Sequence, residues 1–508
     1  MSPSSLTNSN DYHIEKKMRK LLYIDLFCGA GGTSTGVERT YLNGEKCAEV
    51  IACVNHDPHA IASHLANHPR AIHFTEDIRT LDLSDLVRHA RQEREKNPGA
   101  LLVLWASLEC INFSKAKGGQ PRDPDSRTLA EHLFRYIEAL DPDYVQIENV
   151  REFMMWGDLD ENGHPVSRDR GRLYLRWTRN VCAYGYDYDW RVLNAADYGA
   201  YTSRERFFGI FARKGLPIVF PQPTHCKGGA EGLFGDLKKW KAVGEVLDLE
   251  DEGRSIFDPR RKPLAENTLK RIYAGLVKFV AGGKDAFQQK RDVERVSFLS
   301  KQYSGDDASK NIGIDGPAGT VTTRDHHAFI TASMAKRDSH ALHFLDNQYG
   351  TGRPSSIHEP AHTVTTNPKS RLVEVRREGA VRRHQYLLNP QFNSAGASLD
   401  KPCFTLIARM DKRPPQIVTA CDGQGPESSR EDSPMTAKIK EFMSLYGISD
   451  IFIRMLKIVE LKRIMGFGDD YVLVGTTTEQ KKYIGNAVET NMANALCRSL
   501  AVEINRTC

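Results

Sequence analysis

Between residues 19 and 215, short apolar runs alternate with stretches of helical pattern, and this alternation restricts the chain to one class of fold. Runs of strand character lie at 21–27, 49–55, 101–107, 143–149, 187–194 and 207–213. Helical pattern lies between them, as at 57–66 and 127–140. Strands that alternate with helices predict an α/β fold, with a mostly parallel sheet covered by helices on both faces. A ligand of such a sheet binds beyond the carboxyl ends of the strands, where the distinctive polar residues of this sequence fall.

The composition excludes several classes of protein. Ten cysteines in 508 residues, with no Cys-x-x-Cys pair, do not predict a disulfide scaffold or a zinc ribbon. No uncharged apolar run reaches the roughly 18 residues of a membrane span. Residues 1–18 are polar, which predicts a disordered tail and not a secretory signal. We therefore expect a cytoplasmic protein of two or three domains, without a metal site.

The chain changes character after residue 215. Residues 251–418 carry 27 Lys and Arg against 18 Asp and Glu, although the whole chain has a net charge of only +5. This uneven distribution favours a polyanionic partner, while a solvated surface is the plainer interpretation.

An internal repeat, with a period of about 43 residues, lies within 298–418. Its three copies are at 317–330, 360–373 and 402–418, and they place Thr320, Thr363 and Thr405 in equivalent positions. β-Branched residues dominate each copy, so each is expected to form a pair of strands. The expected organisation is a tail at 1–18, a first domain at 19–215, a second, β-containing domain at 216–452, and a helical segment at 453–508 that returns to the first domain.

A glycine-rich turn follows the first predicted strand, in the sequence DLFCGAGGTSTG at 25–36. Glycines permit a tight turn and the close approach of a ligand to the backbone. The pattern matches neither the dinucleotide pattern GxGxxG nor the phosphate-binding loop that ends in GK[ST]. A nucleoside cradle and a plain structural turn both remain open from this motif alone.

Three further motifs carry residue types suited to chemistry. Cys110 follows a predicted strand, in SLECINFSKAKGG, and the neighbouring lysines would favour its thiolate, although a buried packing role is an alternative. Glu148 ends another strand in an apolar setting, which raises a carboxyl pKa and allows proton donation to a ring nitrogen; a capping role is the alternative. Arg204 and Arg206 stand two apart, so on a strand they would point the same way and reach a carbonyl and a phosphate, unless they are an exposed pair.

Together with GNAV at 485–488, these motifs resemble the cytosine-C5 DNA methyltransferase family in both order and spacing. The resemblance covers roughly residues 20–215 and 454–500. It implies a Rossmann-like fold that binds S-adenosylmethionine, with the region from 216 to 452 as the target recognition domain. The segment 460–471 resembles the family motif that precedes the final GN[SA]V. The resemblance assigns cofactor binding to Phe27, Cys28, Gly29, Ala30, Gly31, Gly32, Asn55, His56, Asp77, Ile78, Glu109, Leu129, Asn486 and Ala487.

The resemblance implies transfer of a methyl group from S-adenosylmethionine to carbon 5 of a flipped-out cytosine in a specific sequence of double-stranded DNA. Cys110 would be the nucleophile that adds to carbon 6, and Glu148 would hold or protonate N3. Arg206, with Arg204, would bind the O2 carbonyl or a neighbouring phosphate. A stacked base is out of reach of these groups, so the cytosine must leave the duplex.

Four positions depart from the family pattern. Glu109 and Ile111 flank the cysteine where the family has Pro and Gln, Asn55 replaces the glutamate that binds ribose, and Thr202 replaces a glutamine before the paired arginines. Asn55 can still form a hydrogen bond with a ribose hydroxyl, but without charge assistance. We interpret these departures as marks of a variant subfamily with Glu-Cys at the nucleophile.

The basic segment would bind DNA phosphates, and side chains in its loops would recognise bases. The expected DNA contacts are Ser114, Lys115, Lys117, Arg324, His326, His327, Asn367, Lys369 and Arg409. We expect a prokaryotic or phage-encoded monomer with no membrane partner, and a cognate restriction endonuclease as a functional partner. The alternatives are an RNA cytosine methyltransferase, a catalytically silent DNA-binding member of the fold, and a small-molecule methyltransferase; the long insert disfavours the first and last.

Overall fold

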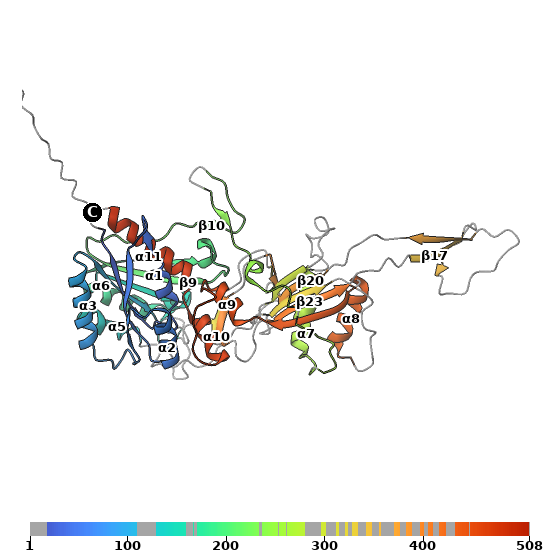
Figure 1. Cartoon of the computed structure of the whole chain (residues 1–508), viewed down its shortest axis with the longest axis horizontal. Helices are drawn as coiled ribbons and strands as arrows, with labels where there is room; N and C mark the ends of the chain where they lie inside the picture. The colour runs from blue at the N-terminus through green and yellow to red at the C-terminus, as the bar shows by residue number, and fades with distance from the viewer. Residues whose placement is uncertain are drawn as a thin grey trace, which may run out of the picture. The chain divides into compact units, whose positions relative to one another are not determined.

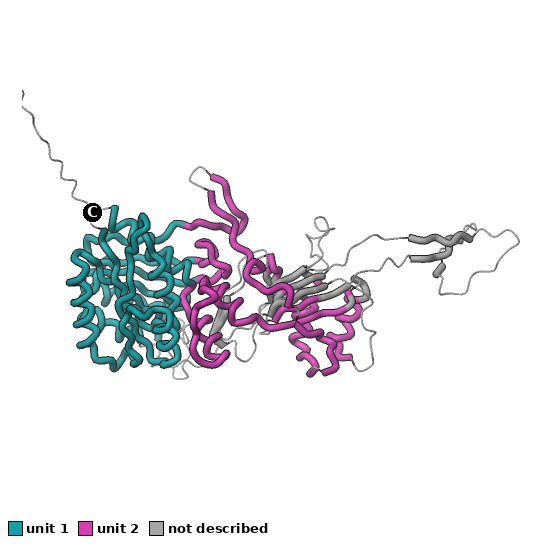
Figure 2. Tube along the Cα trace, viewed as in Figure 1, with its two compact units in different colours: residues 1–193, 206–222, 490–508 teal, residues 194–205, 223–489 magenta. Residues whose placement is uncertain are grey.

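The computed structural model describes residues 18–108, 129–158, 166, 170–232, 236–251, 253–260, 262–279, 399–400, 432–446 and 448–506, together with the strands between residues 296 and 422. The chain forms two compact units (Figure 2). The first comprises residues 1–193, 206–222 and 490–508, and the second comprises residues 194–205 and 223–489. The C-terminal return to the first unit therefore begins at Thr490, whereas the sequence predicted it at 453.

The first unit is built on a seven-stranded sheet in the order β5-β4-β1-β6-β7-β9-β8. The pairs β1–β4, β4–β5, β1–β6 and β6–β7 are parallel, and β7–β9 is antiparallel. The predicted α/β fold with a mostly parallel sheet is thus confirmed. The strands are β1 (Leu21–Leu26), β4 (Ala48–Val54), β5 (Ile72–Phe74), β6 (Leu101–Ser107), β7 (Tyr144–Asn149), β8 (Tyr186–Asn194) and β9 (Glu205–Arg213).

Helices cover both faces of this sheet, as Figure 1 shows. Every residue of β1 and β7 is buried, as expected for central strands with helices on either side. The first unit also contains a short hairpin of β2 (Tyr41–Leu42) and β3 (Glu45–Lys46) and the 3-10 helix η2 (Arg151–Met155). Its helices are α1 (Gly32–Glu38), α2 (Pro58–Asn67), α3 (Ser84–Lys96), α5 (Leu133–Leu140), α6 (Arg172–Ala183) and α11 (Thr490–Arg506).

Two details of the first unit differ from the sequence prediction. Strand β5, only three residues long, was not predicted, because so short a run carries no alternation. Helix α5 begins at Leu133, whereas the helical pattern began at 127. The six predicted strands all form, with ends that move by at most two residues.

Helices α1 and α11 pack at very short range, which fastens the C-terminal helix to the turn after β1. A Cβ atom on Gly36 would lie 2.5 Å from the Ala493 Cβ and 2.6 Å from the Thr490 carbonyl oxygen, so only glycine fits there. Asn494 Nδ2 donates to the Gly36 carbonyl and to Thr40 Oγ1, each at 3.0 Å.

The second unit is built on an eight-stranded, mostly antiparallel sheet that closes on itself. The order β12-β24-β16-β13-β21-β20-β23 is closed by pairing between β23 and β24, which leaves those two strands without a free edge. The strands are β12 (Arg254–Ser255), β13 (Val296–Ser300), β14 (Asn311–Gly313), β16 (Ala328–Ser333), β20 (Arg383–Leu388), β21 (Ala397–Ser398), β23 (Gln416–Asp422) and β24 (Ile448–Met455).

Helices α7 (Glu266–Phe279) and α8 (Pro434–Tyr446) pack together against this sheet. Ile272 and Ile439 share a core with Val418 of β23 and Ile451 of β24. Outside the repeat region, this unit also contains η4 (Ala195–Tyr198), β10 (His225–Cys226), β11 (Lys238–Lys239), η5 (Val243–Val246), α9 (Ile458–Ile464) and α10 (Thr477–Asn486).

The repeat is visible in the structure, where the second copy belongs to a different sheet from the first and third copies. The first copy contains β15 (Val321–Thr323) and β16, and the third contains β22 (Thr405–Arg409) and β23. Strands β15 and β22 pair in parallel, and β16 and β23 belong to the closed sheet. The second copy contributes β19 (Ser370–Val375) to a separate sheet with β17 (Leu342–Asn347) and β18 (Ser355–Ser356). The first and third copies thus each contribute two strands, but among the described residues these strands pair with strands outside their own copy and not with each other.

Within the part of the chain that the structure describes, no helix has both the length and the apolar composition needed to cross a bilayer.

Candidate active site

The glycine-rich turn after β1 has a backbone that few side chains tolerate. Phe27, Gly29 and Gly31 adopt positive φ angles of 60°, 52° and 98°. A positive φ in a bulky residue such as Phe27 is strained, and such strain gathers at binding sites. A Cβ atom on Gly29 would meet nothing within 4 Å, so the backbone there is open to a ligand.

The same turn is anchored on its inner side. The Cys28 N–H donates to the Val54 carbonyl at 3.3 Å, and the Gly31 N–H donates to the Cys28 carbonyl at 3.0 Å. Cys28, Ala30 and Gly32 are buried. The turn is therefore a fixed cradle whose accessible groups belong to the backbone, and it fits a nucleoside-containing cofactor such as S-adenosylmethionine.

Asn55 follows β4 and presents a donor to solvent where the family glutamate would present an acceptor. Its Oδ1 accepts the Asp57 N–H at 2.9 Å, so Nδ2 is the group left for a ligand. His56 is exposed beside it. Asp57 in turn caps α2 by accepting from the His59 N–H at 3.0 Å.

Asp77 lies in the loop after β5 with its carboxylate held by Arg79. Arg79 Nη2 contacts Asp77 Oδ2 at 2.6 Å, and this hydrogen bond lowers the pKa of the Asp77 carboxyl below its ordinary 3.8. Ile78 is buried, and its carbonyl accepts from the Tyr136 hydroxyl at 2.9 Å. Arg135 donates to three carbonyls of this loop, including the Ile78 carbonyl at 3.2 Å, so the loop is tied to α5.

Glu148 and Arg206 form a buried ion pair on the adjacent strands β7 and β9. Arg206 Nε lies 3.2 Å from Glu148 Oε1, with 10% and 7% of the two side chains exposed. Glu148 is opposite Phe208 in the antiparallel register, so Arg206, two residues away, projects from the same face as its diagonal neighbour. The guanidinium neutralises the carboxylate and restricts its orientation.

Asn149 is a buried residue next to Glu148 that the sequence reasoning did not single out. Its Nδ2 donates to the Leu108 carbonyl at 3.3 Å, and its Oδ1 accepts the Val150 N–H at 2.8 Å. Leu108 is two residues before Cys110. The ENV motif could have indicated this residue, because a buried asparagine at the end of a strand needs hydrogen-bond partners for both its amide oxygen and its amide nitrogen.

Arg204 directly precedes β9, and its Nη1 donates to the Gly485 carbonyl at 3.1 Å. Both arginines are buried, so they are not the exposed pair that the sequence left open as an alternative. Their joint role at a substrate stays a prediction. Gly485 opens the GNAV motif, in which the exposed Asn486 is the last residue of α10 and Ala487 is its C-cap.

Most of the remaining predicted residues lie outside the described part of the chain. Leu129 is described and packs in the core of the first unit. Only the backbone of Arg409 is described, in β22. The residues outside the described ranges are Glu109, Cys110, Ser114, Lys115, Lys117, Arg324, His326, His327, Asn367 and Lys369.

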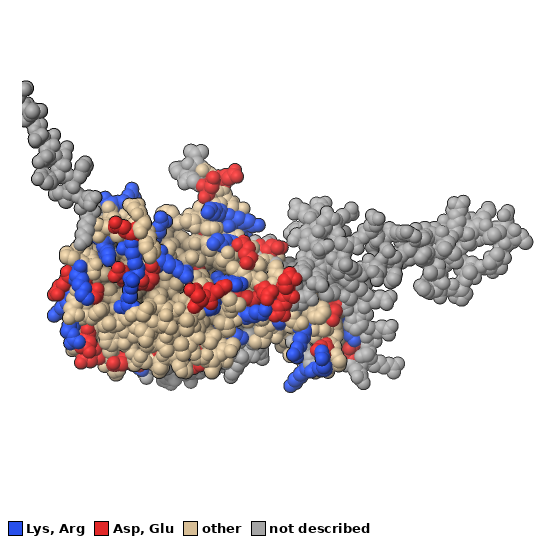
Figure 3. Space-filling model, viewed as in Figure 1, with Lys and Arg blue, Asp and Glu red and all other residues tan. Residues whose placement is uncertain are grey.

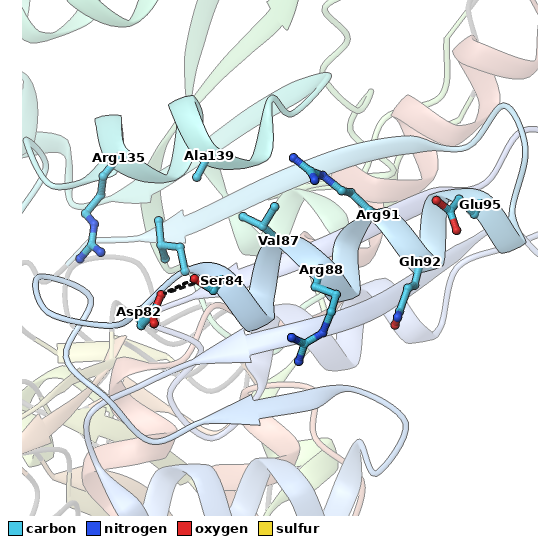
Figure 4. A pocket seen from close by; sticks show the side chains of 10 residues that line it. Asp82, Ser84, Val87, Arg88, Arg91, Gln92, Glu95, Arg135 and Ala139 are labelled. Atoms are coloured by element: carbon cyan, nitrogen blue, oxygen red, sulfur yellow. Dashed lines mark hydrogen bonds between the residues drawn. The ribbon is translucent and has the colours of Figure 1, made fainter.

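An open groove of about 810 Å³ lies along α3 and α5, and Figure 4 shows its lining side chains. Arg88, Arg91 and Glu95 of α3 face it, with Arg135 of α5. It contains none of the predicted site residues, and Arg135 is engaged with backbone carbonyls. Basic and acidic side chains of the described residues are interspersed over the face in Figure 3, so charge alone points to no binding surface there.

The sequence model of one family, described as C-5 cytosine-specific DNA methylase, matches residues 21–227 and 365–501. The chain belongs to this family. The match spans the cradle, the Glu148–Arg206 pair and the GNAV motif, and it confirms the resemblance recognised in the sequence.

Several curated relatives are Type II methyltransferases. M.AgeI of Thalassovita gelatinovora is 32% identical over 211 residues, which cover 41% of this chain and 44% of the relative. M.XorII of Xanthomonas oryzae pv. oryzae is 30% identical over 238 residues, which cover 46% of this chain and 48% of the relative. The matched part of the chain thus spans just under half the length of these relatives.

A solved structure of the Entamoeba histolytica methyltransferase EhMeth aligns with 96% of this chain and 99% of its own, at 13% identity and a TM-score of 0.44. The assignment of the fold rests on the sheet order and not on this weak similarity.

Proposed function

We propose that the chain transfers a methyl group from S-adenosylmethionine to carbon 5 of a cytosine that is flipped out of a specific double-stranded DNA sequence. The observation that carries this proposal is the buried Glu148–Arg206 pair at the end of β7. In the register of the parallel sheet, Glu148 lies beside Ser107, three residues before Cys110. A carboxyl group and a thiol thus follow neighbouring strands, as catalysis on the cytosine ring requires.

S-adenosylmethionine, when bound, supplies the methyl group from its sulfonium centre. Backbone groups between Phe27 and Gly32 would hold it, and Asn55 Nδ2 would donate to a ribose hydroxyl. The Asp77 carboxylate would accept from the adenine amino group while it keeps its bond to Arg79. Asn486 and Ala487, in the second unit, are part of the proposed cofactor set on the strength of the family motif.

Cys110 is the proposed nucleophile. Carbon 5 of cytosine is a poor nucleophile, but addition of a thiolate at carbon 6 gives an enamine in which carbon 5 is reactive. Lys115 and Lys117 would favour the thiolate electrostatically. Asn149, which fixes the Leu108 carbonyl, positions the strand end from which Cys110 follows. The Glu109-Cys110-Ile111 sequence makes this a variant of the family pattern.

Glu148 is the proposed proton donor to N3, and Arg206 is its positioning partner. When the Cys110 sulfur adds to carbon 6, electron density moves towards N3, where a proton from Glu148 neutralises it. After methyl transfer, the C5 proton leaves to a base, the bond between sulfur and carbon 6 breaks, and the N3 proton returns to Glu148. The Cys110 thiolate and the neutral methylated cytosine are thereby released.

Sequence recognition is assigned to the second unit. Residues 251–418 hold the positive excess that would bind phosphates, and affinity for DNA should therefore fall steeply with salt. The proposed base and phosphate contacts are Ser114, Lys115, Lys117, Arg324, His326, His327, Asn367, Lys369 and Arg409. A cognate restriction endonuclease is proposed as the functional partner, because the relatives are Type II methyltransferases.

The test uses purified protein and S-adenosylmethionine with a labelled methyl group. Duplex DNA, RNA and a sample without acceptor are incubated, and the products are digested to nucleosides. We expect label in 5-methyldeoxycytidine only. Cys110→Ala should abolish it, and Glu148→Gln should lower the rate by about 10²- to 10⁴-fold, the range of general acid catalysis.

Cys182→Ala is the matched control, because Cys182 is a half-buried cysteine of α6 that is outside the site. Label in RNA would transfer the proposal to an RNA substrate. No label in either acceptor, with cofactor binding intact, would favour a silent DNA-binding protein.

A further inference from the structure

A compact group of metal-ligating side chains lies buried beneath the glycine-rich turn. It comprises Cys28 of the turn, Cys53 of β4 and His64 of α2, here called the Cys28–Cys53–His64 cluster. The two Sγ atoms and a ring nitrogen of His64 all lie within 4.8 Å of one another, and all three residues are buried. Catalysis as proposed above uses none of these side chains.

The parallel sheet brings the cluster together. Strands β1 and β4 are neighbours, with Asp25 opposite Cys53, and the Cys28 N–H is bonded to the Val54 carbonyl. Helix α2 follows β4 and returns along the sheet, which places His64 over both thiols. The residues are 25 and 11 positions apart in the sequence, a spacing that resembles no zinc motif, and the sequence accordingly predicted no metal site.

The imidazole of His64 is oriented by a second pair of residues. Ser34 Oγ donates its single proton to Asp25 Oδ2 at 2.7 Å, so it accepts from His64 Nε2, which lies 2.9 Å away. His64 Nδ1 is then an acceptor, and it faces Cys53 Sγ at 3.6 Å. The Ser34 hydroxyl, which is itself bonded to Asp25, thus fixes the tautomer of His64, and outer-shell hydrogen bonds of this kind orient the histidine ligands of metals.

The spacing of the ligand atoms fits a tetrahedral zinc site. With Zn–S near 2.3 Å and Zn–N near 2.0 Å, a tetrahedron separates sulfur from nitrogen by about 3.6 Å. That is the distance between Cys53 Sγ and His64 Nδ1. His73 of β5 lies beside the cluster, with its Nε2 2.9 Å from His64 Nδ1. Two nitrogen ligands of a tetrahedral zinc ion are roughly 3.3 Å apart, so the His73 ring would have to move outwards to become a ligand.

We infer that Cys28, Cys53 and His64 bind one Zn²⁺ ion, with His73 as the fourth ligand. Two thiolates would neutralise the charge of the ion in a site that excludes water, and sulfur with imidazole nitrogen is the donor set that selects zinc. The ion would replace the proton that His64 and His73 share, and the thiol protons would leave to solvent.

Such a site would be structural, and it would stabilise the glycine-rich turn that is proposed to hold the cofactor. It joins the turn after β1, the end of β4, helix α2 and strand β5. The same elements carry Phe27 to Gly32 and Asn55, and Asp77 follows in the loop after β5. Because a metal that binds only the folded state stabilises it by mass action, zinc should raise the unfolding midpoint of the first unit.

The test is a spectroscopic titration of the full chain with Co²⁺, after reduction and removal of metals with a chelator. We expect one equivalent to bind, with the intense visible bands of tetrahedral cobalt and a near-ultraviolet thiolate-to-cobalt charge-transfer band. Stoichiometric Zn²⁺ should displace it. If the unmodified chain gives an octahedral spectrum without the charge-transfer band, the inference is overturned, regardless of the results with the variants.

Variants identify the ligands. Cys53→Ser should remove the charge-transfer band, while Cys47→Ser, at another buried cysteine of the first unit, should leave it unchanged. Ser34→Ala should weaken zinc binding about 10- to 100-fold, as loss of an outer-shell partner does. Equal spectra for Cys53→Ser and Cys47→Ser would overturn the assignment. An unchanged spectrum in His73→Gln would overturn the fourth ligand. None of these readouts depends on methyl transfer.

Discussion

The Glu148 carboxylate and the Arg206 guanidinium face each other across β7 and β9 at 3.2 Å, with at most a tenth of either side chain exposed. Two strands that are far apart in the sequence thus present an acid and its counter-ion from one face of the sheet. Because this position is almost completely shielded from solvent, each of the two charges is stabilised by the other.

Removal of one member of this pair should cost more stability than removal of both. Arg206→Ala would leave the Glu148 carboxylate buried and unpaired, which costs roughly 3–5 kcal/mol. Glu148→Gln combined with Arg206→Met should be closer to the wild type. Urea unfolding followed by tryptophan fluorescence measures the difference, and equal losses in the single and double variants would show that the pair is not coupled.

Asn149→Ala should reduce catalysis more than cofactor binding. The change removes the donor to the Leu108 carbonyl, and a buried carbonyl without a partner costs about 1–3 kcal/mol. The strand end before Cys110 would then lose its anchor. We expect a lower kcat with an unchanged Kd for S-adenosylmethionine by calorimetry. A weakened Kd with an unchanged kcat would contradict the positioning role.

Gly36→Ala should destabilise the first unit. The new methyl group would lie 2.5 Å from the Ala493 Cβ, so α1 and α11 would have to separate. Overpacking of this kind costs about 1–3 kcal/mol. Gly228→Ala is the matched control, since nothing lies within 4 Å of its Cβ position. Thermal unfolding that shows equal midpoints for the two variants would refute the close contact.

Asp25→Asn should change how stability depends on pH. Burial raises the pKa of Asp25 from 3.8 to about 7, so the folded state holds a proton that the unfolded state loses above pH 4. This contribution is fully present below the unfolded pKa and is lost as the pH rises through 7.

The free energy of unfolding of the wild type, relative to Asp25→Asn, should therefore fall between pH 4 and pH 8 by on the order of a few kcal/mol. Denaturant titrations with a chelator present measure it. Parallel pH profiles for the two proteins would mean that Asp25 has an ordinary pKa.

Excision of the second repeat copy should leave the closed sheet folded. Ser333 and Arg383 are directly paired at the ends of β16 and β20, so a two-residue Asn-Gly turn can join them in place of residues 334–382. The excised segment includes Asn367 and Lys369 of the proposed DNA contacts. We expect a similar unfolding midpoint by calorimetry and a shallower salt dependence of DNA binding. An unfolded product would show that the sheet needs the copy.

Local patterns determined much of this protein in advance. Apolar runs alternate with helical segments over 19–215, so the parallel sheet and all six predicted strands followed from periodicity. Glu148 and the cradle were identified from the sequence, because strand ends and glycine turns carry strong local signals. The family, too, was recognised from motif order.

Only the tertiary structure decided which distant residues meet. It paired Arg206 with Glu148 and Arg204 with the Gly485 carbonyl, because both partners come from distant parts of the sequence. The structure also shows that the sheet of the second unit closes on itself and that the second repeat copy belongs to a separate sheet. Strand pairing joins residues far apart in the sequence, so a local pattern does not determine it. The tertiary structure gathered Cys28, Cys53 and His64 from a turn, a strand and a helix. The spacing of these residues in the sequence does not predict the cluster, because the parallel sheet and the returning helix set the distances between their side chains.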